Sequence, residues 1–386
     1  MTRFAIDARP AVEPRRTGVG VYTDAILRYL PPADPDTHYL AWYLDLVGIG
    51  ARSRRFAGRA PNLTEKATRF PIRFFGPVSA RTRLPRLEWL VRDADLFVAT
   101  NFLPPPTGEP QRCVLVVHDM AWSVLPASAP HHNARWRSRF AAALRTCAAA
   151  IVPSSAVRDD LVETGSVPPD RVEVIHHGVD ADAFHPAPPP EVEDVRRRYG
   201  IDGPYVLFVG GLEPRKNLET LVRAFAMLEY PISLVVVGGK VRWAPGYAER
   251  IDHAVAELPE HVQRRVIRTG FVPDEDRRAL LSGAEVLAYP SRYEGFGFPV
   301  LEGFAANVPV LTSSTSALPE VAGDAALLVD PDDPGAIAEG LAQLLDDEDL
   351  RNVLRAAGTA RVATFTWQRC ARSTAAALHR AAERAR

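Results

Sequence analysis

Two neighbouring cations, Arg215 and Lys216, follow an apolar run in the segment VLFVGGLEPRKNLETL. Pro214 suits a first helical position, so the sequence predicts a helix that begins near Arg215. A helix dipole disfavours cations at that end by about 0.3–1 kcal/mol each, and a bound anion would offset this cost. An arginine guanidinium can donate two parallel hydrogen bonds to phosphate oxygens, a lysine adds a positive charge, and helix N–H groups add further hydrogen-bond donors. The pair therefore predicts a diphosphate site, with two solvated surface cations as the alternative.

A carboxylate pair, Glu294 and Glu302, lies in SRYEGFGFPVLEGF, after the apolar run AEVLAYPS. A glycine-rich loop leads there to a helix that opens at Pro299, and the N–H groups of Val300 and Leu301 are expected to form a second anion-binding helix start. Glu302 would repel a phosphate unless it binds neutral hydroxyls, such as the vicinal pair of a ribose. A sugar ring offers the same pair to Glu294. The alternatives are the two carboxyl groups of a glycosidase, or an ordinary helix-start acid beside a solvated loop acid.

Weaker signals come from histidine, glycine and aspartate. His118 follows the run VLVV at its carboxyl end, where ligands of parallel sheets bind, so function is favoured over a structural role. Gly18 and Gly20 precede the helical pattern VYTDAILRYL and on their own indicate only a turn. Three acidic pairs or runs resemble the DxD sequence motif that binds a metal ion in other transferases. Because Arg215 and Lys216 already supply cations, no metal is expected. These acids are Asp93 and Asp95, Asp180 and Asp182, and Asp330 to Asp333.

The elements that must position these residues alternate between short apolar runs and helical patterns, which predicts parallel sheets covered by helices. The runs are RFAID, LFVAT, VLVVHD, AIVPSS, VEVIHHG, YVLFVGG, SLVVVGG, RVIRTG and AEVLAYPS. They form two blocks, separated between Ala183 and Val195 by clustered prolines that predict a stiff linker. We expect an α/β protein with two domains, 1–185 and 194–365, facing each other across a cleft. A helical Ala/Arg-rich segment, 366–386, ends the chain and could pack on either block.

Composition bounds the function classes. The chain has 386 residues, with 46 Lys and Arg against 47 Asp and Glu, so no overall basic field indicates nucleic acid as a partner. Cys113, Cys147 and Cys370 lie far apart, and neither a disulfide framework nor a zinc site is expected. The first residues carry no apolar signal segment, and no run approaches the roughly 18 apolar residues of a membrane span. A cytoplasmic location is expected.

The stretch between Arg52 and Arg92 is strongly basic, with eleven Lys and Arg residues against Glu65 and Glu88. Aromatic and leucine residues interleave with the basic ones, a mixture that suits anionic lipid. Trp136, Arg137, Arg139 and Phe140 could extend this surface. Peripheral contact with the inner face of the cell membrane is one interpretation, and the other is a variable acceptor-side loop whose arginines pair with acids elsewhere.

Taken together, the motifs TGVG, HD, GGLEPRKN and EGFGFPVLEG and the closing aromatic-Trp helix resemble the family-4 retaining glycosyltransferases of the GT-B fold, over nearly the whole chain. The resemblance implies two Rossmann-like domains, with the C-terminal helix returning to the N-terminal one. Glu294 and Glu302, with seven residues between them, are its most specific signal. When the binding residues of the family are matched to this sequence, the resemblance implies that Arg215 and Lys216 bind the diphosphate.

The same resemblance assigns further roles. It implies ribose binding by Glu302, and sugar contacts by Glu294 and His118. Gly18 and Gly20 resemble the loop that lets acceptor and phosphate approach the backbone. The rest of the phosphate shell would be Asn217, Gly297, Phe298, Val300 and Leu301.

The implied reaction retains the anomeric configuration without a metal or other cofactor, and the leaving diphosphate helps to deprotonate the acceptor. The motif spelling resembles bacterial mannosyltransferases of polysaccharide or glycolipid assembly. The expected donor is GDP-mannose, and the acceptor a glycan or a lipid-linked sugar. Open alternatives are a UDP-glucose-type donor, a phosphorylase or hydrolase of the same architecture, and a non-catalytic nucleotide-sugar sensor.

Overall fold

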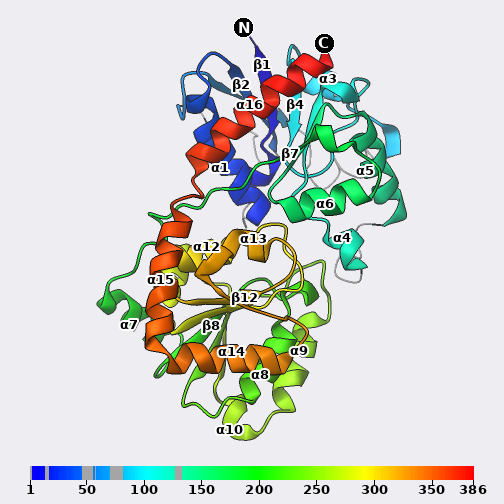
Figure 1. Ribbon diagram of the computed structural model, residues 1–386. Helices are drawn as coiled ribbons and strands as arrows, with labels where there is room; N and C mark the ends of the chain where they lie inside the picture. The colour runs from blue at the N-terminus through cyan, green and yellow to red at the C-terminus, as the bar shows by residue number, and fades with distance from the viewer. Residues whose placement is uncertain (1, 14–16, 46–54, 57, 70–80, 127–132) are drawn as a thin grey trace. The chain divides into compact units, whose positions relative to one another are not determined.

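The structure, a computed structural model, describes residues 2–13, 17–45, 55–56, 58–69, 81–126 and 133–386 (Figure 1). It divides into two compact units. Unit 1 contains Met1–Met120, Asn133–Gly178 and Trp367–Arg386, and unit 2 contains Ala121–His132 and Val179–Thr366. The division after Gly178 falls before the domain limit at 185 that the sequence suggests.

Among its described residues, unit 1 has a parallel sheet in the order β3-β2-β1-β4-β5-β6-β7. The strands are β1 (Arg3–Asp7), β2 (His38–Asp45), β3 (Leu63–Arg69), β4 (Leu96–Ala99), β5 (Cys113–Val116), β6 (Ala149–Val152) and β7 (Val172–Val174). The main helices around it are α1 (Gly18–Ala33), α3 (Leu87–Leu90), α5 (Ala134–Thr146) and α6 (Ser155–Glu163). The central strands are buried along their whole length, as expected for a sheet covered on both faces.

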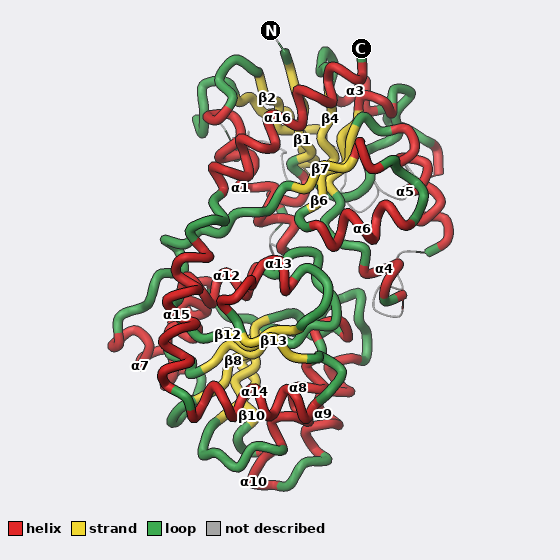
Figure 2. Tube along the Cα trace, viewed as in Figure 1, coloured by secondary structure: helices red, strands yellow, loops and turns green. Residues whose placement is uncertain are grey.

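Unit 2 has a second parallel sheet, in the order β10-β9-β8-β11-β12-β13. Its strands are β8 (Tyr205–Val209), β9 (Ser233–Val237), β10 (Val266–Gly270), β11 (Val286–Tyr289), β12 (Val310–Ser313) and β13 (Leu327–Val329). Its helices are α7 (Pro189–Arg198), α8 (Leu218–Ala226), α9 (Tyr247–Ala256), α10 (Glu260–Gln263), α11 (Asp274–Ser282), α12 (Phe298–Ala305), α13 (Leu318–Ala322), α14 (Pro334–Asp346) and α15 (Glu348–Val362). Figure 2 shows α12 and α13 on one face of this sheet and α8 and α14 on the other.

The core of unit 2 follows from the two-residue period of a strand. Tyr205 and Leu207 of β8 belong to the apolar cluster that includes residues of α11, α12 and α13. Val206 and Phe208 of the same strand belong to the cluster that includes residues of α8, α9 and α14. Each fully buried side chain of this size contributes about 1.5–3 kcal/mol. Both faces therefore hold β8 in place, and with it the loop that follows its carboxyl end.

The last helix, α16 (Trp367–Ala385), packs against α1 within unit 1, which confirms the expected return to the N-terminal domain. Its buried residues recur every three or four positions, so they form one face. His379 on this helix lies 3.0 Å from the Asp34 carboxylate at the end of α1. The two Rossmann-like units and this helix are the architecture that the sequence predicted.

Two local predictions were wrong. The proline-rich segment contains helix α7, which begins at Pro189 with prolines at its first two positions, so the stiff linker is shorter than predicted. Proline is tolerated there because the first N–H groups of a helix have no intrahelical partner. Four strands, β2, β3, β12 and β13, were also missed. One of them, β3, lies inside the basic stretch and pairs with β2, so this part of the stretch is sheet rather than loop.

Candidate functional site

Arg215 and Lys216 lie at the carboxyl end of β8, but not at the start of an α-helix as predicted. Residues Pro214–Lys216 form a 3-10 turn, and α8 begins only at Leu218, after Asn217 in the left-handed conformation (φ 61°). Pro214 therefore begins a separate 3-10 turn, and the α-helix follows this turn instead of starting at Pro214. The two cations are placed by this turn, at the edge of the sheet where ligands of such folds bind.

The side chain of Asn217 has structural contacts, and its expected phosphate contact stays a prediction. Its side chain is fully buried, and its amide nitrogen donates to the carbonyl oxygens of Pro290 (3.0 Å) and Pro331 (2.6 Å). Its amide oxygen accepts a hydrogen bond from Thr220. Both amide protons are thus used within the protein, and the side chain ties the loops after β8, β11 and β13 together.

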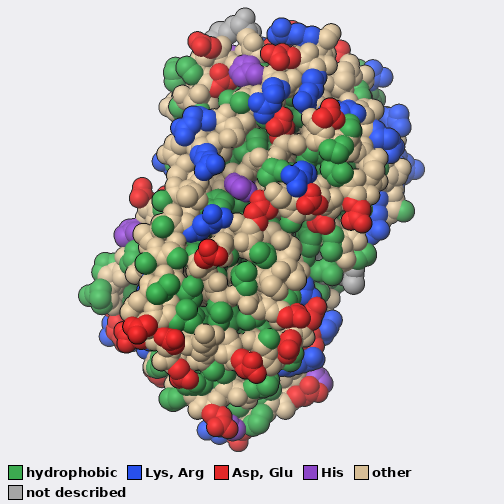
Figure 3. All heavy atoms as spheres, viewed as in Figure 1, with side chains coloured by type: hydrophobic (Ala, Val, Ile, Leu, Met, Phe, Trp, Pro, Cys, Tyr) green, Lys and Arg blue, Asp and Glu red, His purple; other side chains and the backbone are tan. Residues whose placement is uncertain are grey.

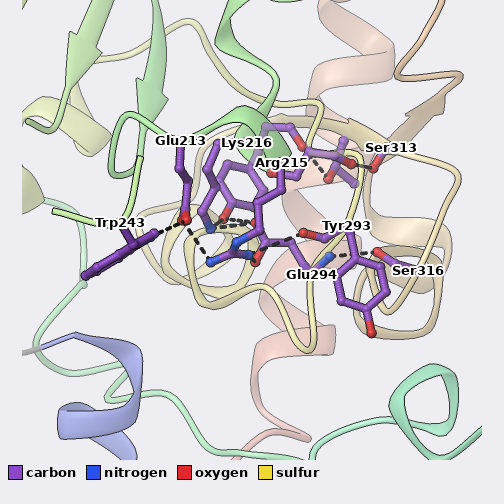
Figure 4. Close-up of polar contacts among 11 residues, drawn as sticks. Glu213, Arg215, Lys216, Trp243, Tyr293, Glu294, Ser313 and Ser316 are labelled. Atoms are coloured by element: carbon purple, nitrogen blue, oxygen red, sulfur yellow. Dashed lines mark hydrogen bonds and ion pairs between the residues drawn. The ribbon is translucent and has the colours of Figure 1, made fainter. Parts of the chain in front are cut away.

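Glu294 is the centre of a buried ion network (Figure 4). Its Oε2 accepts from Arg215 Nη1 at 2.7 Å, and its Oε1 accepts from Lys216 Nζ at 2.5 Å and from the Tyr289 hydroxyl at 2.7 Å. The residue is only 6% exposed. A buried carboxylate needs such partners, because an unpaired one carries a large desolvation cost. In this arrangement the carboxylate is committed to the two cations, and the expected sugar contact of Glu294 stays a prediction.

A second carboxylate, Glu213, balances the network. Its Oε1 pairs with Arg215 Nη2 at 2.9 Å, and its side chain is as buried as that of Glu294. Two cations thus face two carboxylates. Burial alone would raise the pKa of Glu294, but Arg215 and Lys216 hold it at about 2. Burial lowers the pKa of Lys216, and Glu294 opposes that effect. The cluster can present fixed, partly desolvated cations to an anion, where charge-assisted hydrogen bonds are strongest.

Hydroxyl groups from β12 and the turn after it hold the loop that carries Glu294. Thr312 and Thr315 donate to the carbonyl oxygens of Tyr289 (2.9 Å) and Arg292 (3.1 Å). The Ser316 hydroxyl accepts the backbone N–H of Glu294 at 3.0 Å. The sequence reasoning missed these residues and Glu213, although the run TSSTS directly after an apolar run was a visible signal.

Glu302 lies in the first turns of α12 and is separately paired. Its Oε2 accepts from Arg277 of α11 at 3.1 Å, and the Arg277 guanidinium also lies 4.8 Å above the Phe184 ring. Burial raises the pKa of Glu302, and Arg277 opposes the rise. A carboxyl group with one cationic partner keeps capacity to accept from neutral hydroxyls. Arg277 is a further residue that the sequence reasoning did not single out.

The glycine-rich start of α12 is partly as predicted. Gly297 has φ 113°, and a Cβ atom there would lie 2.7 Å from Leu318, so only glycine fits without a shift. Phe298 begins the helix beside Phe296, and the side chains of Val300 and Leu301 are buried in the core. The Val300 N–H donates to the Gly297 carbonyl at 3.1 Å. That amide bonds within the turn, and its expected contact with a ligand stays a prediction.

In unit 1, His118 follows β5 and lies in a cluster of aromatic and histidine rings. Its Nε2 lies 2.7 Å from the Thr100 carbonyl oxygen, and its Nδ1 lies 3.4 Å from Nε2 of His177. A carbonyl only accepts, so Nε2 of His118 is the donor. Tyr22 packs edge-on against His118, with ring centroids 5.1 Å apart. Burial lowers the pKa of both histidines, which keeps the pair neutral.

Gly18 and Gly20 lie in the first turn of α1, rather than in a loop before it as expected. Gly18 is exposed and Gly20 is buried. The helix begins at Gly18, three residues before Val21, where the apolar pattern starts. Thr17, which directly precedes the helix, has an extended backbone. The glycines can still bring helix N–H groups near a ligand, and this role stays a prediction.

The aspartate pairs serve local structure where contacts are described. Asp95 accepts the backbone N–H of Arg3, and Asp333 caps α14. Asp330 accepts the backbone N–H of Asp332. Over the part of the chain that the structure describes, no three His, Cys, Asp or Glu side chains come together as a metal site would require.

The described part of the basic stretch belongs to unit 1. Arg59 pairs with Asp24 at 2.9 Å, whereas Arg81, Arg83 and Arg86 are exposed. Trp89 is 55% exposed beside them. Lys and Arg side chains gather over the elements around α5 in Figure 3. Arg52, Arg54, Arg73, Phe70, Phe74 and Phe75 lie outside the described residues.

Some apolar members of the predicted surface are instead core. Phe56, Leu87 and Phe140 are buried, so they are not available to a membrane. Trp136 is half-buried and stacks on Phe140, with ring centroids 5.1 Å apart. Within the described ranges, no helix is long and apolar enough to cross a membrane.

Two Rossmann-like units, with a buried cation pair at the carboxyl edge of the second sheet, define a glycosyltransferase of the GT-B type. Sequence comparisons agree: residues 191–361 match the family of group 1 glycosyl transferases, and residues 16–183 match Glycosyltransferase Family 4. The chain belongs to the family-4 glycosyltransferases. It is 31% identical over 301 residues to O-antigen chain mannosyltransferase B of Escherichia coli, which covers 75% of this chain and 76% of the relative.

Another relative is named for a different sugar. The chain is 31% identical over 283 residues to the alpha-maltose-1-phosphate synthase of Mycolicibacterium smegmatis, covering 68% of this chain and 71% of the relative. Among solved structures, Anabaena HepE in complex with UDP and glucose superimposes with a TM-score of 0.72 at 16% identity, over 98% of this chain and 100% of that one. This last similarity concerns the fold alone.

Proposed function

We propose that this glycosyltransferase moves a hexose from a nucleotide-sugar to a glycan or lipid-linked acceptor with retention of configuration. The observation that carries the proposal is the half-buried pair Arg215 and Lys216, fixed by the buried Glu294 at the carboxyl edge of the second sheet. This pair binds the donor diphosphate. Glu302 binds the ribose hydroxyls, and His118 and Glu294 contact the transferred sugar.

The proposed reaction is a same-face displacement. The bond from the anomeric carbon to the phosphate oxygen breaks, and a bond to the acceptor oxygen forms through an oxocarbenium-like transition state. The acceptor proton goes to the departing diphosphate, whose negative charge Arg215 and Lys216 stabilise without a metal. Preorganised charges of this kind are commonly the largest contribution to catalysis.

The proposed donor is GDP-mannose. The supporting observation is the similarity to O-antigen mannosyltransferases of Escherichia coli over most of the chain. A UDP-glucose-type donor is the second candidate, because one relative, the alpha-maltose-1-phosphate synthase, is named for a product built of glucose.

A panel of GDP-, UDP-, ADP- and TDP-sugars tests the donor by thermal shift. A ligand at 100 times its dissociation constant stabilises a protein by about 2.7 kcal/mol. GDP-mannose should give the largest shift, and no shift with any donor would contradict the proposal. NMR of the product distinguishes retention from inversion, and loss of turnover on chelation would contradict metal independence. Binding of a donor without turnover or donor hydrolysis would favour a non-catalytic sensor. The absorbance of a bound cofactor would favour a phosphorylase.

We further propose that the basic face of unit 1, namely Arg81, Arg83, Arg86, Leu84 and Trp89, contacts anionic lipid at the inner face of the cell membrane. These residues are exposed. Each basic residue near such a surface contributes about 1 kcal/mol, so reversing the three arginine charges should lower vesicle binding at least tenfold. Phosphatidylglycerol vesicles, with phosphatidylcholine vesicles as control, measure this. Equal partitioning of the variant and the wild type would contradict the membrane contact.

A further inference from the structure

Glu213 joins the cation pair to a tryptophan from a neighbouring loop. One of its carboxylate oxygens pairs with Arg215 Nη2 at 2.9 Å, and the other accepts from the indole Nε1–H of Trp243 at 2.8 Å (Figure 4). Glu213 is 4% exposed, and Trp243 is half-buried. The indole N–H thus fixes the carboxylate that in turn contacts the arginine.

The backbone leaves these two loops little freedom to separate. The N–H groups of Gly210 and Leu212 donate to the carbonyl oxygens of Val237 (2.9 Å) and Gly239 (3.0 Å). Gly238 adopts φ 138°, and a Cβ atom there would lie 1.8 Å from the Gly210 carbonyl oxygen. The close approach requires glycine at this position. Trp243 therefore reaches Glu213 from a segment that is fastened to the loop carrying Arg215.

The guanidinium of Arg215 has a different partner on each terminal nitrogen. Nη1 donates to Glu294 at 2.7 Å and to the Tyr293 carbonyl at 3.3 Å, and Nη2 pairs with Glu213. Two carboxylates on two nitrogens fix the plane of the group. Arginine recognises phosphate through a planar fork, so the orientation of this plane decides how well a diphosphate is bound.

We propose that Trp243 is a positioning residue for the diphosphate grip, acting on Arg215 through Glu213. This inference rests on the proposed function, in which Arg215 binds the donor diphosphate. The indole adds no charge and acts only on orientation. Its effect is therefore the same for every nucleoside diphosphate, whatever the base, and extends to inorganic pyrophosphate.

The test is the variant Trp243→Phe, which keeps an aromatic ring and removes the N–H donor. One hydrogen bond is worth about 1 kcal/mol, so affinity for GDP, UDP and pyrophosphate should fall by about three- to tenfold, by the same factor for each. The matched control is Tyr230→Phe, which removes a hydroxyl donor to the carboxylate of Asp346 and should bind as the wild type does. Isothermal titration gives the dissociation constants, and the melting temperature of each variant without ligand reports folding.

A double-mutant cycle with Glu213→Gln tests the route. If Trp243 acts through Glu213, Trp243→Phe has no further effect on affinity in the Glu213→Gln background. The proposal is overturned if Trp243→Phe binds as the wild type does, if it loses affinity for one base only, or if the two changes are additive. A lower melting temperature with unchanged affinity also overturns it, since that indicates a purely structural role. Absence of any binding by the wild type would instead contradict the proposed function itself, and this inference with it.

Discussion

The two clusters at the carboxyl ends of parallel strands differ in kind. In unit 2, Arg215, Lys216 and Glu294 form a network of buried charges. In unit 1, His118, His177 and Tyr22 form a cluster of neutral rings. The side chains at this strand-end position are therefore charged in unit 2 and neutral in unit 1.

This difference indicates which part of a ligand each cluster suits. Buried ions are costly to desolvate, so a protein that retains them at a sheet edge gains something from their charge. An anion would benefit most from the cations of unit 2. Neutral rings suit an uncharged sugar. The comparison therefore supports the proposals that the cations of unit 2 bind the diphosphate and that His118 of unit 1, together with Glu294 of unit 2, contacts the sugar.

The change Glu294→Gln should break the charge network most severely. It leaves two buried cations with one carboxylate, and removal of one partner of a buried pair costs about 3–5 kcal/mol. We expect the free energy of unfolding in urea to fall by that amount. If the carboxylate serves only a sugar, stability without ligand would stay unchanged.

The pH dependence of this loss follows from the pKa of Glu294, about 2 in the folded protein against its usual 4.5. The ionised carboxylate stabilises the fold above its unfolded-state pKa, and this contribution is lost as the pH falls toward 2. The stability difference between wild type and Glu294→Gln should therefore narrow below about pH 4.5. A difference that does not change between pH 7 and pH 3 would contradict the assignment.

Arg215→Ala should weaken binding of nucleoside diphosphate by about 100-fold, since charge-assisted hydrogen bonds contribute about 1.5–3 kcal/mol. The control is Arg197→Ala, because Arg197 forms an exposed pair with Asp194. Isothermal titration measures both. Equal affinity of Arg215→Ala and wild type would show that the diphosphate binds elsewhere.

His118→Gln should sharpen the contrast between the units. The neutral His118 cluster is expected to act on the sugar, so turnover should fall by about tenfold while the dissociation constant for free nucleoside diphosphate changes by less than about twofold. The exposed His253 supplies the control, His253→Gln. A parallel loss of diphosphate affinity in His118→Gln would break the proposed division of roles.

Tyr289→Phe should have the smallest effect. It removes one of the three side-chain donors to Glu294 and leaves both cations, so we expect a loss of about 1 kcal/mol in the free energy of unfolding. A loss as large as that of Glu294→Gln would mean that the hydroxyl, rather than the cations, holds the carboxylate.

The sequence predicted most of the strands that are buried on both faces, but it missed β2 and β12, which are buried as well. The run YVLFVGG is continuous and apolar, RFAID has three apolar residues between Arg3 and Asp7, and both are central strands. Strand β3, LTEKATR, was missed because it lies at the sheet edge, and its polar pattern follows from partial exposure. Strands β12 and β13, four and three residues long, were missed although β4 and β7, of the same lengths, were predicted, so strand length alone does not decide which strands can be predicted.

Within the candidate site, sequence reasoning predicted types of residue better than their partners. Arg215, Lys216 and Glu294 do lie together, although they are 79 and 78 positions apart along the chain. Their direct pairing could not be predicted, because contacts between β8 and β11 depend on strand order. The 3-10 turn was missed because an asparagine in the left-handed region carries no charge or periodicity signal.

Asn217 has a consequence for the dynamics of the site. Its side chain joins loops that follow three different strands. Opening the loop after β8 would break both hydrogen bonds, and opening the loop after β11 or β13 would break one of them. Local unfolding in proteins proceeds through such cooperative groups. We therefore expect the three loops to open cooperatively. In hydrogen exchange, backbone amides around Pro214, Ser291 and Asp332 should then exchange with solvent at one shared rate.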